Sequence, residues 1–563
     1  ALPDHWINRW HHVLARYDGK KMELYVDGEL LGEESCSGSI RNAPYQVILG
    51  KSAELRDSHM GYMCHATLDK VGIFDWVVPV ADLKSADESL RSRSLLWLDF
   101  EEIKEEGSYY SIGIPGRTYG LIWPDRTVQP EMWQMKKSPQ PIAFALKGPE
   151  EGTIEITNRY HFRNLEELNF SWELTSDGLA VQEGTFQLDL EAGAKKMKQV
   201  PFDLSQLAPG SVNHLLVSAS TRSDFPWAKA GHEVAWEQFE LSSQNELSGK
   251  EPLAMAKPDL PLELIESDAS LEVKGNNFSY VFDRQSGDLS SMIIQGREMV
   301  SRGLRFNVWR APLANDLDSW NFWHTEMGHV TDGMGKETAN GWRSIGLDQL
   351  EQAVDHIRGD AENGTIRIHV EASLHAMNYT TGFKVFYEYT INGEGEMNIA
   401  CRVSSRGNMT KWIPKVGLQM ELPGEFQQME WFGRGPFENY PDRKTGAKTG
   451  IYRTSVEEDY VPYIIPQDYG NRCDVHWFRL SDQEGRGLQV SSGELFNFSA
   501  QKYSTANLDR AHYPFHLKEE DVVTLNLDHR VSGVGGTANS VLNPYRVSPG
   551  EFEFSFTINP LIP

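Results

Sequence analysis

Apolar and polar residues alternate with a period of two along most of this chain, and that alternation restricts the chain to β-structure. The segment Glu551–Ile558 alternates strictly, and Phe278–Asp283 does so near the other end of the same long stretch. Residues 262–563 show no helical periodicity, so we expect a large sandwich of two packed sheets there. The predicted fold class is therefore mainly β.

The remaining sequence predicts smaller domains, because 563 residues are too many for one ordinary core. Residues 1–100 carry short strand candidates separated by Asp-Gly turns. Residues 139–241 contain short alternating runs, about seven of them, which is typical of an immunoglobulin-like sandwich. Residues 242–261 are polar and contain proline, as a linker does.

Residues 108–138 differ from the rest because they predict one strand followed by one helix. We expect a buried strand over Tyr119–Trp123, and Pro130 is a favourable first residue for a helix whose last turn holds Lys136 and Lys137. A single β/α unit cannot close a barrel. We therefore expect this unit to need a partner.

The charge of the chain argues against a nucleic-acid partner. It carries 80 acidic and 54 basic side chains, a formal net charge of −26, whereas nucleic-acid binding needs clustered cations. No run approaches the ~18 apolar residues of a membrane-spanning helix, and the N-terminus has no basic-then-apolar signal. We expect a soluble protein without a membrane partner, and the sequence does not choose between periplasm and cytoplasm.

Cysteines and histidines do not predict a metal site. The cysteines lie far apart without a Cys-x-x-Cys pair, and the first two either form a disulfide or stay reduced: Cys36, Cys64, Cys401 and Cys473. His5, His11 and His12 cluster, but His11 and His12 would face opposite sides of a strand.

The segment Trp431–Arg443 is the most distinctive string in the chain. Two glycines and two prolines set a tight corner within the β-rich stretch. Asp442 and Arg443 can hold that corner by charge-assisted hydrogen bonds.

This string, with Arg310–Asp316 upstream and Tyr460–Pro466 and Gly470–Cys473 downstream, resembles the last domain of the large bacterial β-galactosidases of glycoside hydrolase family 2. The resemblance implies that the large sandwich is a galactose-mutarotase-like super-sandwich. It also implies that the β/α unit is the last unit of a (β/α)8 barrel, whose other seven units are not in this sequence.

The N-terminal strand pattern, including Trp10–Val13 and Leu68–Val71, resembles the second half of a laminin-G or concanavalin-like jelly roll. A jelly roll without its opening strands would leave open edges. We therefore expect Ala1 to mark a truncation point, a processing site or a subunit junction. Asp18, Asp27 and Asp69 are calcium ligands only by residue type.

The two carboxylates of a retaining glycosidase, which lie about 5–5.5 Å apart, are not evident in the sequence. Asn245-Glu246 is the one Asn-Glu pair, but it lies in the polar linker. Glu438 lies close to Asp442 in sequence, yet its Gly/Pro corner favours a structural hydrogen-bonding role. We therefore assign no catalytic residue to this chain.

The resemblance does imply residues at the rim of a sugar pocket. They lie at the end of the last barrel strand, in a loop beside the pocket, and in the glycine-rich loop Gly533–Ser540. The substrate-binding candidates are Arg117, Tyr119, Asp318, Trp320, Asn539 and Ser540. The family has a tryptophan near the position of Ser540, and Trp320 or Trp323 could supply the missing aromatic face.

The expected function is thus the C-terminal portion of a retaining β-galactosidase, which supplies scaffold and pocket rim but not the catalytic glutamates. Its expected partners are a β-galactoside or related oligosaccharide, an upstream catalytic-barrel polypeptide and further copies of the enzyme in an oligomer. No cofactor is expected within this chain, whereas the complete enzyme could use Mg or Na in the barrel. A non-catalytic carbohydrate-binding protein is the alternative, and an aldose epimerase with a His476–Glu438 or His512–Glu438 pair is a third reading.

Overall fold

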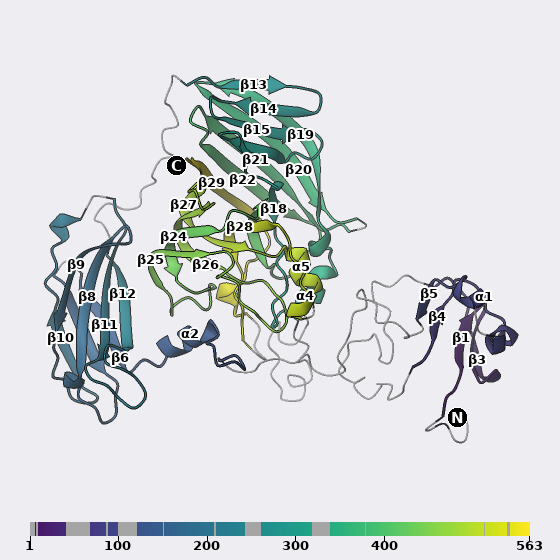
Figure 1. Cartoon of the computed structure of the whole chain (residues 1–563), viewed down its shortest axis with the longest axis horizontal. Coiled ribbons are helices and arrows are strands. Elements are labelled where there is room, and N and C mark those ends of the chain that lie inside the picture. Colours follow the sequence, from purple (N-terminus) through teal and green to yellow (C-terminus); the bar gives the residue numbers. More distant parts are fainter. Residues whose placement is uncertain are drawn as a thin grey trace. The chain divides into compact units, whose positions relative to one another are not determined.

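In the computed structural model the chain forms two compact units, residues 1–112 and 113–563 (Figure 1). The described residues are 6, 9–40, 68–85, 88–98, 121–149, 151–207, 210–241, 260–317, 338–377, 379–511, 513–536 and 541–562.

The N-terminal unit contains an antiparallel meander of β1 (Val13–Tyr17), β2 (Lys21–Val26) and β3 (Glu29–Ser35). Asp27 and Gly28 both have positive φ, 53° and 87°, so the predicted Asp-Gly pair forms the tight turn between β2 and β3. A second small sheet pairs β4 (Val71–Ile73) with β5 (Leu96–Leu98). The short helices are η2 (Val80–Ser85) and α1 (Glu88–Arg91).

The helix of the expected β/α unit is present as α2 (Glu131–Lys137). Pro130 precedes it with helical backbone angles, φ −54° and ψ −32°, as the sequence predicts for a proline at a helix start. Of the expected strand Tyr119–Trp123, the described part begins at Leu121. There Ile122 forms an isolated antiparallel bridge with Val128, so the chain turns back on itself before α2.

Seven strands follow α2 and form two sheets around one apolar core. One sheet has the order β10-β7-β6 and the other β12-β11-β8-β9. Apolar side chains from both sheets meet in the core, among them Ile154, Phe170 and Val217. The elements are β6 (Ile142–Gly148), β7 (Thr153–Asn158), η3 (Leu165–Glu167), β8 (Leu168–Ser176), β9 (Leu179–Phe186), β10 (Lys195–Gln199), η4 (Leu204–Gln206), β11 (Asn213–Thr221) and β12 (Glu233–Leu241). We call this body the small sandwich.

The C-terminal body, here called the large sandwich, contains a five-stranded and a twelve-stranded antiparallel sheet. The five-stranded sheet runs in chain order: β13 (Glu263–Glu266), β14 (Ser270–Lys274), β15 (Phe278–Asp283), β16 (Leu289–Ile294) and β17 (Arg297–Glu298). The predicted strand Phe278–Asp283 is therefore confirmed as β15.

The larger sheet has the order β18-β23-β28-β27-β29-β22-β21-β20-β19, and β26 continues it from β27 to β24 and β25. Its strands are β18 (Arg302–Asn307), β19 (Glu351–Glu362), β20 (Thr365–His375), β21 (Gly382–Asn392), β22 (Met397–Arg406), β23 (Lys415–Pro423), β24 (Gln428–Gly435), β25 (Lys448–Ser455), β26 (Arg472–Ser481), β27 (Gly487–Gln501), β28 (Val522–Val531) and β29 (Glu551–Leu561). Both sheets contribute to one apolar core, for example through Tyr280 and Tyr389.

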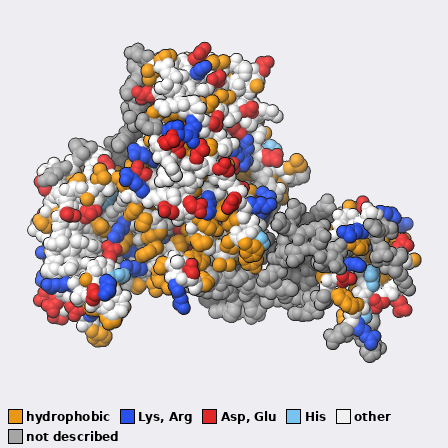
Figure 2. All heavy atoms as spheres, viewed as in Figure 1, with side chains coloured by type: hydrophobic (Ala, Val, Ile, Leu, Met, Phe, Trp, Pro, Cys, Tyr) orange, Lys and Arg blue, Asp and Glu red, His pale blue; other side chains and the backbone are white. Residues whose placement is uncertain are grey.

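Short helices cover parts of the large sandwich: α4 (Thr338–Arg343), η5 (Leu347–Gln349), α5 (Thr505–Arg510), η6 (Pro514–His516) and η7 (Asn543–Tyr545). Acidic and basic side chains intermingle over the face of this body seen in Figure 2. The fold is mainly β, as the alternation predicts, and α2 precedes both sandwiches in sequence.

Candidate functional site

The corner Trp431–Arg443 begins within β24 and continues past its end at Gly435, and its glycines allow close packing against β25 and β26. A Cβ atom on Gly435 would lie 2.6 Å from Cδ2 of Tyr452, and one on Gly433 would lie 2.9 Å from Cα of Val475. Larger residues would therefore push β24 away from β25 and β26. Tyr440 and Arg443 then close the corner with mutual backbone hydrogen bonds of 3.3 and 2.8 Å.

Glu438 is buried in this corner with both carboxylate oxygens engaged. Its Oε1 accepts from the Tyr463 hydroxyl and from Arg443 Nη2, each at 2.5 Å, and its Oε2 accepts from the Gly470 amide at 2.9 Å. Burial, with the Glu438 carboxylate close by, raises the pKa of Tyr463 well above its usual range, so its hydroxyl remains a donor. Glu438 thus has the structural hydrogen-bonding role that the sequence favours.

Helix α2 is attached to the corner through Arg443. The guanidinium pairs with Glu131 at the start of α2 as well as with Glu438. One turn further along α2, Gln134 donates to Thr445 Oγ1 at 2.7 Å and accepts from the Gly446 amide at 2.9 Å. We call the cluster of Glu131, Arg443, Glu438 and Tyr463, in which Glu438 is buried and the other three are partly buried, the corner clamp, because it joins α2 to the large sandwich.

Aromatic packing extends this attachment. Trp133 of α2 stacks on Phe437, with ring centroids 5.6 Å apart and planes at 15°. Trp123, the last residue of the expected barrel strand, packs edge-on against Tyr463 at 5.7 Å. The segment that would belong to a barrel is therefore fixed against the corner.

Asp442 and Arg443 both make charge-assisted hydrogen bonds at the corner, as the sequence predicts, but with separate partners. The two oxygens of Asp442 accept from the amides of Val534 and Gly535 at 2.9 and 2.8 Å. Neighbouring residues in this tight turn face different partners, so Asp442 holds the start of the glycine-rich loop while Arg443 holds α2. A Cβ atom on Gly533 would lie 2.3 Å from Asp442 Oδ2, which explains glycine there.

Two predicted rim loops begin close to Asp442, and the residues at their beginnings contact each other. Asn315 Nδ2 donates to the carbonyl of Val534 at 2.9 Å. Arg310, fully buried, donates to the carbonyl oxygens of Ser532 and Gly533 at 2.9 and 3.2 Å and pairs with Asp316. The structure thus brings together the residues just before Asp318 and just before Asn539.

All six predicted substrate-binding residues lie outside the described residues: Arg117, Tyr119, Asp318, Trp320, Asn539 and Ser540. The same holds for Trp323 and for the Asn245-Glu246 pair. They stay predictions.

The buried network contains carboxylates that titrate near neutral pH. Burial raises the pKa of Asp459 to about 6, against the opposing effect of its partner Arg472. Burial likewise raises the pKa of Asp528 to about 6, although Lys415 lies 3.3 Å away. Asp459 follows β25 and Asp528 lies in β28, and each carboxylate pairs with a basic side chain of the same body.

An epimerase-type His–Glu pair does not occur at the described corner. The hydrogen bonds of Glu438 go to Arg443, Tyr463 and Gly470, whereas His476 stacks on Phe432 at 4.4 Å. His512 lies outside the described residues.

Metal ligands do not assemble in the part of the chain that the structure describes, where no group of three His, Cys, Asp or Glu residues could hold an ion. His11 instead pairs with Asp27 at 2.8 Å, and Asp18 accepts from backbone amides. Cys36 is a free, exposed cysteine, whereas Cys64 and His5 lie outside the described residues.

Within the same described ranges, no helix is long and apolar enough to cross a membrane.

Sequence reasoning missed the polar face of α2. Glu131, Gln134 and Lys137 recur every three residues, which places them along one side of the helix. Lys137 binds Glu237 of the small sandwich at 3.0 Å, whereas the other two bind the corner. The spacing indicates a polar helix face, but it does not predict which residues that face binds. Thr445, for example, is 311 residues from Gln134.

The fold and the corner clamp define a multidomain β-sandwich protein in which a helical segment is fixed to the large sandwich. A family model described as the β-galactosidase small chain matches residues 274–558, and one described as β-galactosidase domain 4 matches residues 154–242. Residues 4–84 match the concanavalin A-like lectin/glucanase superfamily. The chain belongs to the β-galactosidase small-chain family.

Curated relatives agree with this membership. The chain is 30% identical over 451 residues to a β-galactosidase of Priestia megaterium, covering 78% of this chain and 41% of the relative. It is 29% identical over 445 residues to a β-galactosidase of Vibrio cholerae, covering 78% of this chain and 40% of the relative. The chain thus spans about two fifths of the length of these relatives and is related to the C-terminal part of such enzymes.

A solved structure, a galactose mutarotase related enzyme from Lactobacillus acidophilus, is similar to part of the chain. It is 11% identical with a TM-score of 0.30, and the match covers 54% of this chain and 98% of that one.

Proposed function

We propose that this chain forms the scaffold and sugar-pocket rim of a retaining β-galactosidase whose catalytic glutamates lie in a separate barrel segment. The observation that carries the proposal is the corner clamp, which fixes α2 and Trp123 to the large sandwich. A clamp of buried and partly buried charges orders its segment at the cost of desolvation, and such ordering is useful where the segment must present a surface in one position.

The outer side of that segment is suited to further β/α units. Ile122, Val128 and Met135 expose large apolar side chains around α2. A barrel helix normally buries such residues against its neighbours, so we infer that the missing barrel units cover them. The matched region covers only 41% and 40% of the two relatives named β-galactosidase. The rest of those relatives is long enough to contain the other barrel units.

The experiment is complementation. We would assay hydrolysis of a chromogenic β-galactoside by this chain alone, by a barrel polypeptide alone, and by the mixture. We expect hydrolysis only in the mixture. Hydrolysis by this chain alone would contradict the proposal and would require an acid pair that includes Glu438 or Asp442.

Two matched variants sharpen the assay. Met135 on α2 and Met197 on the small sandwich are each 51% exposed. Met135→Glu places a charge in the expected interface and should lower complementation at least about tenfold, which is ~1.4 kcal/mol. Met197→Glu serves as the control and should leave it unchanged. Equal effects of both variants would show that α2 does not meet the barrel.

A further inference from the structure

The turn between β11 and β12 presents a rigid aromatic tip at one end of the small sandwich. Phe225 and Ala228 exchange backbone hydrogen bonds of 2.8 and 3.3 Å, which closes a tight hairpin around Pro226 and Trp227. The carboxylate of Asp224 accepts from the Ala230 amide at 3.0 Å and from Lys229 Nζ at 2.7 Å. The tip is therefore ordered by its own polar contacts.

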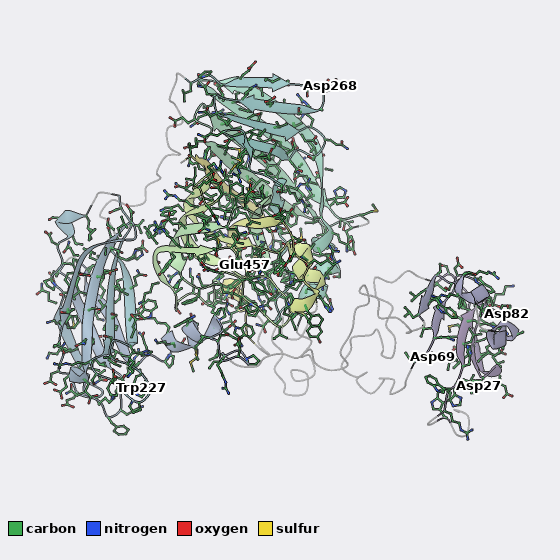
Figure 3. The ribbon with its side chains drawn as sticks, viewed as in Figure 1. Asp27, Asp69, Asp82, Trp227, Asp268 and Glu457 are labelled. Atoms are coloured by element: carbon green, nitrogen blue, oxygen red, sulfur yellow. The ribbon has the colours of Figure 1, made fainter. Side chains whose placement is uncertain are left out.

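The Trp227 ring packs against two aromatic side chains, and the rest of its surface is exposed to solvent. Its ring stacks on Phe225 at 5.6 Å and 23°, and His232 meets it edge-on at 5.7 Å. The guanidinium of Arg163 lies 4.7 Å from the Phe225 centroid, so the supporting ring is itself held in place. Trp227 nevertheless remains 59% exposed, and Figure 3 shows it at the end of the sandwich, beyond the strands.

An exposed indole that is fixed in advance loses little freedom when a ligand stacks on it. The surface it offers is one ring system wide, far below the roughly 1,000 Å² that a specific protein interface needs. A small flat ligand fits this platform better than a protein partner. Hydrophobic side chains reach the surface at this tip in Figure 2, with charged groups beside them.

Polar side chains of the same hairpin can bind hydroxyl groups. Asp224 carries acceptor oxygens and Lys229 carries donor hydrogens, and these two side chains pair with each other. His232, which lies edge-on to the indole, can donate or accept, depending on its tautomer. Aromatic rings pack against C–H groups, while neighbouring polar side chains bind hydroxyl groups at the edge of the same ligand. A net charge of −26 on the chain disfavours anionic ligands.

We propose that the Trp227 platform, made of Asp224, Phe225, Trp227, Lys229 and His232, is a carbohydrate-binding site for a neutral oligosaccharide, with one pyranose ring stacked on Trp227. The preference for galactosyl units rests on the proposed function. In a galactopyranose the axial hydroxyl at C4 leaves the opposite ring face rich in C–H groups, which is the face that would lie on the indole. The site would hold an oligosaccharide on the enzyme apart from the pocket rim.

The test is isothermal titration calorimetry of the whole chain with a β-1,4-linked galactotetraose. We expect a dissociation constant on the order of 1 mM. Trp227→Ala should weaken binding at least tenfold, and Trp227→Phe should retain part of the affinity because it keeps a ring. Leu179→Ala is the control, because Leu179 is 64% exposed and begins β9 at the opposite end of the small sandwich.

Equal galactotetraose affinity for the original chain and for Trp227→Ala would overturn the site. A lower sedimentation coefficient for Trp227→Ala would also overturn it, because that result would identify the tip as a contact between copies of the chain. Binding is measured without the barrel. Failure of complementation therefore leaves this test intact, and failure of binding leaves the proposed hydrolytic role intact.

Discussion

The two sandwiches of the second unit differ in what they bury. Among the described residues, the small sandwich buries no Asp, Glu, Lys or Arg, and its core cluster contains no titratable group. Its buried histidine, His214, alternates with the core residue Leu215 on β11 and is influenced by His476 and Arg434 of the large sandwich. The large sandwich buries many charged side chains: Asp288, Arg310, Asp316, Lys415, Glu438, Asp468, Arg472, Asp482 and Asp528. An apolar core needs only complementary volume, whereas buried charges need specific partners.

That difference follows from what each body must hold in place. The charges of the large sandwich bind loops and α2, as Arg443 does with Glu131 and Arg310 does with Ser532. The small sandwich is fixed to its neighbour at the surface, where Gln238 exchanges two hydrogen bonds with the backbone of Thr449. Buried polar contacts therefore mark the part of the molecule whose loops must be positioned.

The largest expected effect breaks the corner clamp. Arg443→Ala leaves Glu438 and Glu131 without their cation and should lower the free energy of unfolding of the large sandwich by about 3–5 kcal/mol. Urea unfolding followed by tryptophan fluorescence measures this loss, and hydrogen exchange should show lower protection across α2.

Arg453→Ala is the control for that variant. Arg453 also pairs with a glutamate, Glu430, but its side chain is 79% exposed, so the expected loss is about 1 kcal/mol or less. Similar losses for the two arginines would mean that the clamp is not a special feature of the large sandwich.

A smaller effect tests whether buried acids give the large sandwich its own pH dependence. The pKa of Asp459 is about 6 in the folded protein and 3.8 in the unfolded chain, so its contribution to stability is complete below about pH 4 and is lost as the pH rises through 6. The loss should approach about 3 kcal/mol. Asp459→Asn does not titrate, so urea unfolding should show its stability relative to the original protein increasing by about 2 kcal/mol between pH 4 and 6.5.

Tyr469→Phe provides the control, because burial raises the pKa of Tyr469 well above its usual range and its phenol stays neutral throughout. Its effect on stability should be constant over the same pH values. A constant offset for Asp459→Asn as well would contradict the assignment.

The regular parts of this molecule were predictable because they depend on local pattern. Alternation alone placed Glu551–Ile558 within β29 and gave β15 its bounds, and Pro130 marked the start of α2. The isolated bridge at Ile122 was not predictable, because the same apolar run suits a longer strand.

The site was less predictable because its contacts join distant residues. The sequence indicates that Asp442 and Arg443 hold the corner, but not which groups they bind. Val534 is 92 positions from Asp442, and Glu131 is 312 positions from Arg443, so only the packing of loops and α2 on the large sandwich selects these partners.

The smallest expected effect is a pH dependence of opposite sign in the small sandwich. Burial is the main cause that lowers the pKa of His214 from 6.5 to about 4. Its contribution to stability is therefore present above pH 6.5 and is lost as the pH falls through 4, by about 2–3 kcal/mol. His214→Gln should remove that loss, as measured by urea unfolding of the small sandwich between pH 7 and 4. Leu215→Ala, one residue further along β11, should cost about 2–5 kcal/mol at every pH and serves as the control. If His214→Gln keeps the full loss on acidification, another group must cause the acid sensitivity, and the assignment to His214 would fail.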